Sequence, residues 1–419
     1  MDLAYKGYVD ILNEELIPAM GCTEPIAVAY AAALARETLG ALPDRVQVFV
    51  SGNILKNVKS VIVPNTGGMK GIPAATCAGI VAGDAKRKLE VLSALTEDDC
   101  ARIKSFLSTT PVPVEKACSG CVFDIGIRVF RKNEQAFVRI EGKHTNVVAI
   151  EKNGESVFSS ALSSAEQAKR TLTVKNIVEF ADTVPINLIE EVIGRQIELN
   201  FAIASEGLKN DYGAKVGKIL LSSYGGDVHV RARATAAAGS DARMNGCCMP
   251  VVIVSGSGNQ GITASVPVIV YAEHLGVPRE KLIRAVALSD LITIHLKSGI
   301  GRLSAYCGAV SAGVGAGAGV AYLYGGGYDE IAHTVVNAIA IASGIVCDGA
   351  KSSCAAKIAA AVDAGLLGFE MYRGGSQFYG GDGILAGGVE GTIDNVGDLA
   401  RIGMRETDEE IIRLMLESI

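Results

Sequence analysis

Three cysteines in the C-terminal half of the chain, Cys307, Cys347 and Cys354, lie in runs that also contain glycine or serine. Thirty-nine residues separate the first two, and six separate the last two. Three thiolates can hold three irons of a cubane [4Fe–4S] cluster, whereas an electron carrier normally supplies a fourth. A missing fourth ligand leaves one iron open to substrate, as in catalytic metal sites. The pattern predicts a Lewis-acid iron–sulfur enzyme; the alternative is three small thiols buried in a Gly/Ala-rich core.

A Gly- and Ser-rich segment, residues 255–261, reads Ser-Gly-Ser-Gly-Asn-Gln-Gly and precedes a predicted helix that begins at Ile262. Glycines let the backbone approach a ligand, and the helix N-terminus offers free N–H groups and the positive end of a dipole. The segment lacks the Lys-Ser/Thr ending of a P-loop. A small carboxylate is therefore a better candidate ligand than a nucleotide, and the alternative is a polar turn between helices.

Cys22 stands at the predicted start of a helix and is followed by Thr23 and an acidic residue. Thr23 is a good capping residue, and Pro25 fits the first helical turn. Because a helix N-terminus lowers the pKa of a thiol, Cys22 is a candidate base, nucleophile or metal ligand. The alternative is a small, partly buried residue at a kink.

Two further polar segments are candidates for ligand contacts. His144 and Asn146 lie in the run Gly-Lys-His-Thr-Asn at a predicted strand start, and Asn65 and Thr66 open a Gly-rich loop. The sequence contains no H-E-x-x-H and no G-x-S-x-G motif, which disfavours zinc proteases and α/β-hydrolases. The candidate chemistry therefore rests on the cysteines and on these polar loops.

The order of the elements predicts an α+β N-terminal domain followed by a mostly α-helical cluster-binding domain. Three β-rich runs between residues 122 and 151 are separated by turn residues, as in an antiparallel meander. From Val174 onward strand signals almost vanish and helical patterns dominate. We place the boundary in the polar segment 159–170, which gives domains of residues 1–165 and 166–419.

Composition narrows the classes of protein. Of the 419 residues, 49% are hydrophobic and 20% charged, so a large core is expected and disorder is not. A net charge of −6 without long basic runs makes nucleic acid a poor candidate partner. Ten cysteines are too few for a disulfide scaffold, and no signal-peptide pattern opens the chain, so a cytoplasmic location is expected. The run 308–322, rich in Gly and Ala, predicts a buried helix and no membrane span.

Taken together, the motifs resemble the L-cysteine desulfidase family, which is related to the iron–sulfur L-serine dehydratases of bacteria. The resemblance covers nearly the whole chain and rests on Gly21-Cys-Thr-Glu-Pro25, Asn65-Thr-Gly-Gly68, His144-Thr-Asn146, the 255–261 segment, Tyr306-Cys-Gly308 and Cys347-Asp-Gly-Ala-Lys351. The family implies cleavage of L-cysteine to pyruvate, ammonia and sulfide, with a [4Fe–4S] cluster in place of pyridoxal phosphate. We also expect a homodimer that acts on a small amino acid.

The resemblance implies a role for each matching residue. Cys307, Cys347 and Cys354 would hold the cluster, and Cys22, at a position similar to a His-Thr pair in the dehydratases, would act as base. The expected substrate-binding residues are Thr23, Asn65, Thr66, His144, Asn146, Ser255, Ser257, Asn259 and Gln260. Two departures from the dehydratases stand out: the last two cysteines are closer together, and no cysteine follows Cys354 to cap the open iron from a C-terminal tail. The second departure implies a site without tail inhibition.

Three questions stay open at the level of the sequence. An L-serine dehydratase or a related amino-acid lyase would use the same machinery. A non-catalytic iron–sulfur protein or cysteine sensor would bind the ligand without turnover. Cys22 is either the base or a fourth cluster ligand.

Overall fold

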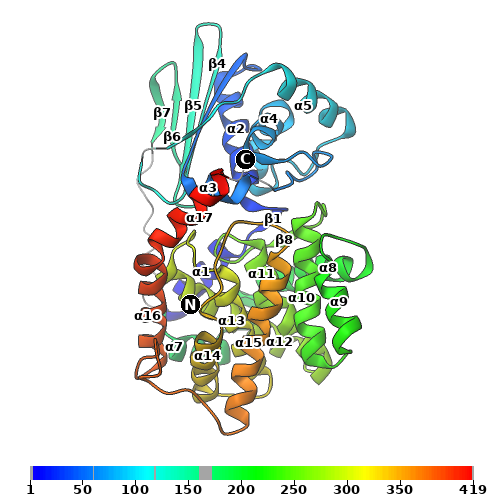
Figure 1. Ribbon diagram of the computed structural model, residues 1–419, viewed down its shortest axis with the longest axis vertical. Helices are drawn as coiled ribbons and strands as arrows, with labels where there is room; N and C mark the ends of the chain where they lie inside the picture. The colour runs from blue at the N-terminus through cyan, green and yellow to red at the C-terminus, as the bar shows by residue number, and fades with distance from the viewer. Residues whose placement is uncertain (1–2, 60, 118, 160–171, 418–419) are drawn as a thin grey trace.

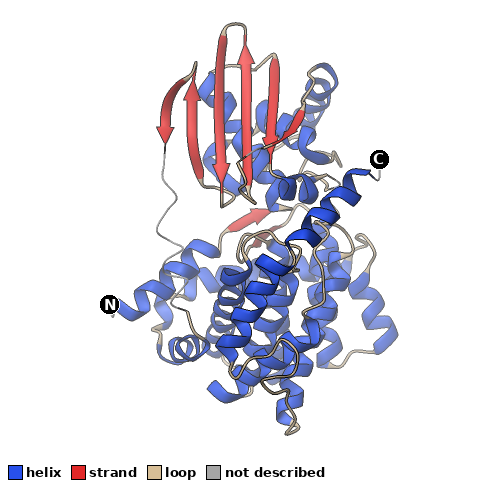
Figure 2. Cartoon of the chain, turned by 60° about the vertical axis from the view of Figure 1, so that its left-hand side comes forward, coloured by secondary structure: helices blue, strands red, loops and turns tan. Residues whose placement is uncertain are grey.

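The protein has two lobes in the computed structural model, which describes residues 3–59, 61–117, 119–159 and 172–417 (Figure 1). One lobe contains a six-stranded sheet with helices on one side, and the other is almost entirely helical (Figure 2). The predicted fold class, an α+β region followed by a mostly helical one, is confirmed.

The sheet has the strand order β3-β2-β4-β5-β6-β7. Its strands are β2 (Arg45–Val50), β3 (Val114–Lys116), β4 (Asp124–Arg131), β5 (Glu134–Glu141), β6 (Val147–Lys152) and β7 (Glu155–Ser159). Only β2 and β3 run parallel, and β4, β5 and β6 form the predicted meander. Because side chains alternate along a strand, Val46, Val48 and Val50 of β2 are buried. Helix α2 (Thr23–Leu39) packs against β4 and β5, with α4 (Gly71–Ala82) and α5 (Glu97–Thr109) beyond it.

The helical lobe is built around α13 (Gly308–Leu323), which packs against four other helices. The helices of this lobe are α7 (Val174–Thr183), α8 (Glu190–Lys209), α9 (Val216–Tyr224), α10 (Val228–Met244), α11 (Gly258–Leu275), α12 (Arg279–Ile300), α14 (Tyr328–Ala342), α15 (Cys354–Arg373) and α16 (Val389–Asp398). Glycine lets α13 and α15 approach closely, since a Cβ on Gly313 would lie 2.3 Å from Ala361 O. The buried helix predicted here is confirmed, and within the described ranges no helix is long and apolar enough to cross a membrane.

The first and last helices each pack against the lobe that is built mainly from the other half of the chain. Helix α1 (Leu3–Glu15) lies with the helical lobe, where Tyr8 stacks on Phe180 with ring centroids 5.0 Å apart. Helix α17 (Arg405–Glu417) instead packs against α3 (Gly52–Val58), next to the sheet (Figure 1). The predicted boundary at residue 165 lies outside the described residues, and the division into two domains there stays a prediction.

Short elements complete the connections. Strand β1 (Pro18–Met20) pairs antiparallel with β8 (Pro250–Val252) and so joins the start of the chain to the helical lobe. Short 3₁₀-helices cover Ala85–Glu90 and Ile186–Leu188, and a π-helical turn covers Leu399–Gly403. The β1–β8 pair matters for the site because Cys22 follows β1 and the 255–261 segment follows β8.

Candidate active site

A cavity of about 100 Å³ lies where the two lobes meet. This is well above the roughly 10–15 Å³ that a single water needs, so a small molecule fits. Nine of the residues singled out from the sequence line it: Cys22, His144, Ser255, Ser257, Asn259, Gln260, Cys307, Cys347 and Cys354. The fold thus brings the cysteines and the Gly/Ser-rich segment to one place.

Backbone pairing explains how Cys307 and Cys347 meet across 39 intervening residues. The Cys307 N–H donates to Ile345 O at 3.1 Å, and the Cys347 N–H donates to Ala305 O at 2.6 Å. Cys354 follows as the first residue of α15. The three thiols are therefore placed by a two-segment ladder and by a helix start.

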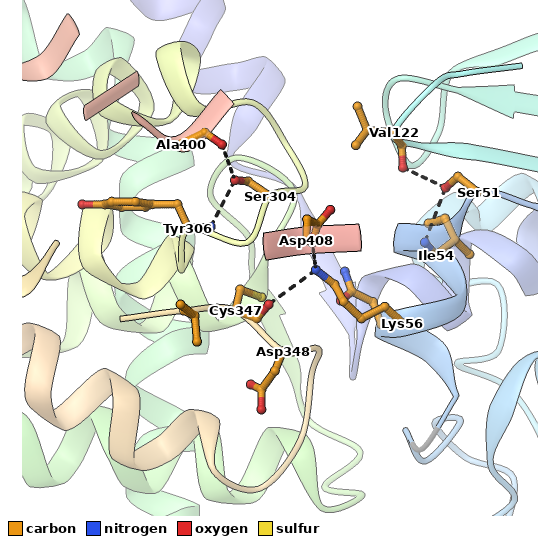
Figure 3. A network of polar contacts seen from close by, with 12 residues as sticks. Ser51, Ile54, Lys56, Val122, Ser304, Tyr306, Cys347, Asp348, Ala400 and Asp408 are labelled. Atoms are coloured by element: carbon orange, nitrogen blue, oxygen red, sulfur yellow. Dashed lines mark hydrogen bonds and ion pairs between the residues drawn. The ribbon is translucent and has the colours of Figure 1, made fainter. Parts of the chain in front are cut away.

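A polar network supports the Cys347 segment from the other lobe (Figure 3). The ammonium of Lys56, on α3, donates to Cys347 O at 3.4 Å and pairs with Asp408 of α17 at 2.5 Å. Nearby, the Tyr306 N–H donates to Ser304 Oγ at 3.1 Å, which steadies the segment before Cys307. The C-terminal helix is thus linked to the cysteine segment through a single lysine.

Four helices direct their N-termini toward the cavity. Cys22, Ser257 and Cys307 are the N-cap residues of α2, α11 and α13, and Cys354 opens α15. Each helix start carries a partial positive charge and unpaired N–H groups. These helix starts therefore favour anionic ligands at the cavity.

The thiols at the cavity fit a thiolate-bound iron–sulfur cluster. A hydrogen bond from the Cys307 thiol lowers the pKa of Cys347 to about 6, with Lys56 and Lys297 acting in the same direction, and the same bond together with burial raises the pKa of Cys307. Burial raises the pKa of Cys354, whose sulfur accepts from the Lys351 N–H at 3.5 Å. Among the described residues no three His, Cys, Asp or Glu side chains converge on a point that would hold one ion. A cubane cluster does not need ligands that converge on one point, since each thiolate binds a different iron.

Cys22 behaves differently from the expectation for a helix N-terminus. Its pKa is raised well above the usual value, because the side chain is buried and because Glu24 lies beside it. The thiol donates to Glu24 Oε2 at 3.2 Å, and Glu24 Oε1 accepts from Asn57 Nδ2 at 3.1 Å. Burial outweighs the helix dipole here, so the predicted lowering of the Cys22 pKa is wrong. Cys22 also packs near Cys354.

His144 contributes a neutral imidazole to the cavity wall. Burial lowers its pKa to about 4, and its Nε2 has no hydrogen-bond partner among the described residues. The ring packs edge-on against Phe123, with centroids 4.6 Å apart. It also lies against Gly256, where a Cβ would come within 2.7 Å of His144 Cε1. At neutral pH this histidine offers a ring nitrogen to a ligand without adding charge.

The Gly/Ser-rich segment forms a tight turn followed directly by a helix. Ser255 and Gly256 have φ angles of 48° and 82°, and the Ser257 N–H donates to Val254 O at 3.0 Å. The Thr23 hydroxyl donates to Gly256 O at 2.9 Å and ties the turn to α2. Helix α11 begins at residue 258, four residues before the predicted start at 262, because these glycines and polar residues already form its first turn.

Four of the predicted substrate-binding residues do not line the cavity. Thr23 lies next to it and holds the turn. Asn65 Nδ2 donates to Leu92 O, the Thr66 hydroxyl to Val63 O, and Asn146 Nδ2 to Glu141 O, at 3.0, 2.7 and 2.9 Å. The structure thus gives these side chains backbone partners, and their contact with substrate stays a prediction.

Several charged and polar side chains of the cavity were not singled out from the sequence: Glu24, Asn57, Arg243, Lys297, Arg302 and Lys357. Only Glu24 lies in a motif quoted from the sequence, Gly21-Cys-Thr-Glu-Pro25. One signal was available, since Arg243 and Lys297 stand on otherwise small or apolar helix faces, where an unpaired charge is rare. Both are buried.

Comparison with known proteins agrees with this arrangement. A family model described as serine dehydratase alpha chain matches residues 86–413. A UPF0597 protein of Desulfitobacterium hafniense is 58% identical over 419 residues, covering 99% of this chain and 97% of its own length. UPF0597 proteins of Lachnoclostridium phytofermentans and Treponema denticola are 50% and 45% identical, covering 98% and 99% of this chain and 100% and 98% of their own. The matched family is generally iron–sulfur dependent, and its members are amino-acid lyases of the serine dehydratase kind. The chain belongs to the serine dehydratase alpha chain family.

Proposed function

We propose that the protein is a [4Fe–4S]-dependent β-elimination lyase that cleaves L-cysteine to pyruvate, ammonia and sulfide. Family membership supports an amino-acid lyase. The observation that carries the proposal is the meeting of Cys22, the three cysteines at 307, 347 and 354, and the N-terminus of α11 around one small cavity.

Each group has a defined task in this proposal. Cys307, Cys347 and Cys354 would hold the cluster, which when bound supplies a Lewis-acidic iron for the sulfur of the substrate. The substrate carboxylate lies at the start of α11, where free N–H groups attract anions. Cys22 removes the Cα proton while the Cβ–S bond breaks, and hydrolysis of the resulting enamine gives pyruvate and ammonia.

The raised pKa of Cys22 requires a proton acceptor before this thiol can serve as base. Glu24 fits that task because its Oε2 lies 3.2 Å from Cys22 Sγ and already accepts the thiol proton in a hydrogen bond. Passing the proton to Glu24 leaves a thiolate at the cavity, and the positive charge of Arg243 stabilises it. Positioned proton transfer of this kind is typically worth ~10²–10⁴-fold in rate.

Sulfur is the preferred leaving atom in this proposal. A soft sulfur leaving group suits an iron site, and Cys22 occupies a position that resembles the histidine of a His-Thr pair in the related dehydratases. The matched family model favours the second candidate, an L-serine dehydratase, which would use the same cavity and the same three cysteines.

Anaerobic reconstitution followed by pyruvate assays on L-cysteine and L-serine decides between these functions. We expect at least a tenfold larger kcat/KM for L-cysteine, which needs only ~1.4 kcal/mol of differential transition-state binding. Equal or faster turnover of L-serine would establish the dehydratase instead. Binding of L-cysteine without release of sulfide or pyruvate would indicate a sensor.

A further inference from the structure

Arg243, near the end of α10, is a buried cation without a counter-ion. Its side chain is 4% exposed and its Nη1 donates to Asn259 Oδ1 at 3.0 Å and to Met244 Sδ at 3.4 Å, both uncharged. Its buried Nε has no hydrogen-bond partner, and within the described part of the chain no carboxylate forms an ion pair with it. Since an uncompensated buried charge is costly, this guanidinium favours an anionic ligand at the cavity.

Most other charged groups of the cavity have partners among the described residues, but buried Lys297, which lies near Cys307 and Cys347, makes no ion pair with a carboxylate there. Arg302, the second arginine in the lining, pairs with Glu15 at 2.9 Å. Glu24 accepts hydrogen bonds from Cys22, Thr23 and Asn57 and makes no ion pair with an arginine in the described residues. Arg243 is therefore the arginine of the cavity that remains available for a ligand.

The guanidinium lies against the first residue of α11. A Cβ on Gly258 would come within 2.4 Å of Arg243 Nε and 2.8 Å of its Cζ, so glycine is required for this close contact. The bond to Asn259 Oδ1 fixes the guanidinium in place. A fixed cation and the unpaired N–H groups of a helix start thus meet at the cavity wall, and planar bidentate recognition of a carboxylate suits arginine.

We propose that Arg243 binds the α-carboxylate of the substrate, together with the first N–H groups of α11. The site then selects amino acids and other carboxylates over amines of the same length that lack the acid. This inference rests on the proposed function in one respect only, namely that the ligand is a small β-substituted amino acid.

Binding measurements on two non-reactive analogues test the inference without turnover. 3-Mercaptopropionate keeps the thiol and the carboxylate, and cysteamine keeps the thiol and the amine. Both are titrated calorimetrically and anaerobically into the reconstituted wild type, Arg243→Gln, Arg243→Lys and Arg302→Gln. If L-serine proves to be the substrate, 3-hydroxypropionate and ethanolamine replace the two thiols, so failure of the cysteine assignment leaves this test intact.

We expect Arg243→Gln to weaken 3-mercaptopropionate binding at least roughly 30-fold relative to cysteamine, the lower end of the loss when a buried charge pair is broken. Arg243→Lys, which keeps the charge but loses the planar fork, should lie between that variant and the wild type. Retained cysteamine binding shows that each variant is folded. Three results would overturn the proposal. Arg243→Lys could lose both ligands equally, or both Arg243 variants could keep the wild-type ratio of 3-mercaptopropionate to cysteamine affinity. Alternatively, Arg302→Gln could lose 3-mercaptopropionate binding selectively while the Arg243 variants do not.

Discussion

The link between the C-terminal helix and the cysteine segment makes a quantitative prediction. Lys56 and Asp408 form an ion pair with an Nζ–Oδ1 distance of 2.5 Å, and their side chains are only 1% and 13% exposed. Removing one partner of a buried pair leaves the other charge unpaired and costs about 3–5 kcal/mol. Since Asp408 keeps some contact with solvent, we expect Asp408→Ala to lower the free energy of unfolding by about 3 kcal/mol.

A matched control lies on the same helix. Glu410 pairs with Arg413 at 2.5 Å, but these side chains are 53% and 51% exposed, so Glu410→Ala should leave the free energy of unfolding close to that of the wild type. The double variant Lys56→Met/Asp408→Leu removes both buried charges and should recover much of the loss, because a buried pair can be replaced by apolar groups with little penalty. Urea unfolding followed by circular dichroism measures all of these free energies.

Iron release provides a second readout of the same link. Lys56 also donates to Cys347 O at 3.4 Å, so loss of its counter-ion should loosen that segment and speed the loss of iron to a chelator. Glu410→Ala should leave the release rate near that of the wild type. The reasoning fails if the unfolding free energies of Asp408→Ala and Glu410→Ala agree within about 0.5 kcal/mol, the range of ordinary surface substitutions.

Three further predictions concern the cavity. Cys307→Ala, Cys347→Ala and Cys354→Ala should each hold far fewer than the about four irons of a cubane in iron analysis, and full occupancy in all three would contradict the assignment. Cys22→Ser should keep its iron yet lose most pyruvate release, since a serine hydroxyl is a much weaker base; loss of iron would make Cys22 a fourth ligand. Because burial lowers the His144 pKa to about 4, stability present above the unfolded pKa of about 6.5 is lost as pH falls toward 4, by about 3 kcal/mol. His144→Gln should flatten that pH dependence in denaturant titrations, and an unchanged slope would refute it.

Local patterns were sufficient for the order of the elements. The β-rich runs between residues 122 and 151 gave the meander of β4, β5 and β6, because alternation along a strand is visible within a few residues. The Gly/Ala-rich run at 308–322 gave α13. Elements of three residues, such as β1 and β8, were not predicted, since each owes its existence to a partner more than 200 residues away.

The same distinction between local sequence and tertiary structure holds for the candidate site. Residue type marked Cys22, the three cysteines of the C-terminal half and the 255–261 segment, because thiols beside glycine and a Gly/Ser-rich helix start are local features. The amino-acid sequence by itself therefore determined the fold class and most of the reactive groups. Only the tertiary structure decided that these groups line one cavity, that the Cys22 thiol holds its proton, and that Arg243 lacks a counter-ion. The physical reason is that desolvation and charge pairing depend on neighbours that the fold brings from distant parts of the chain.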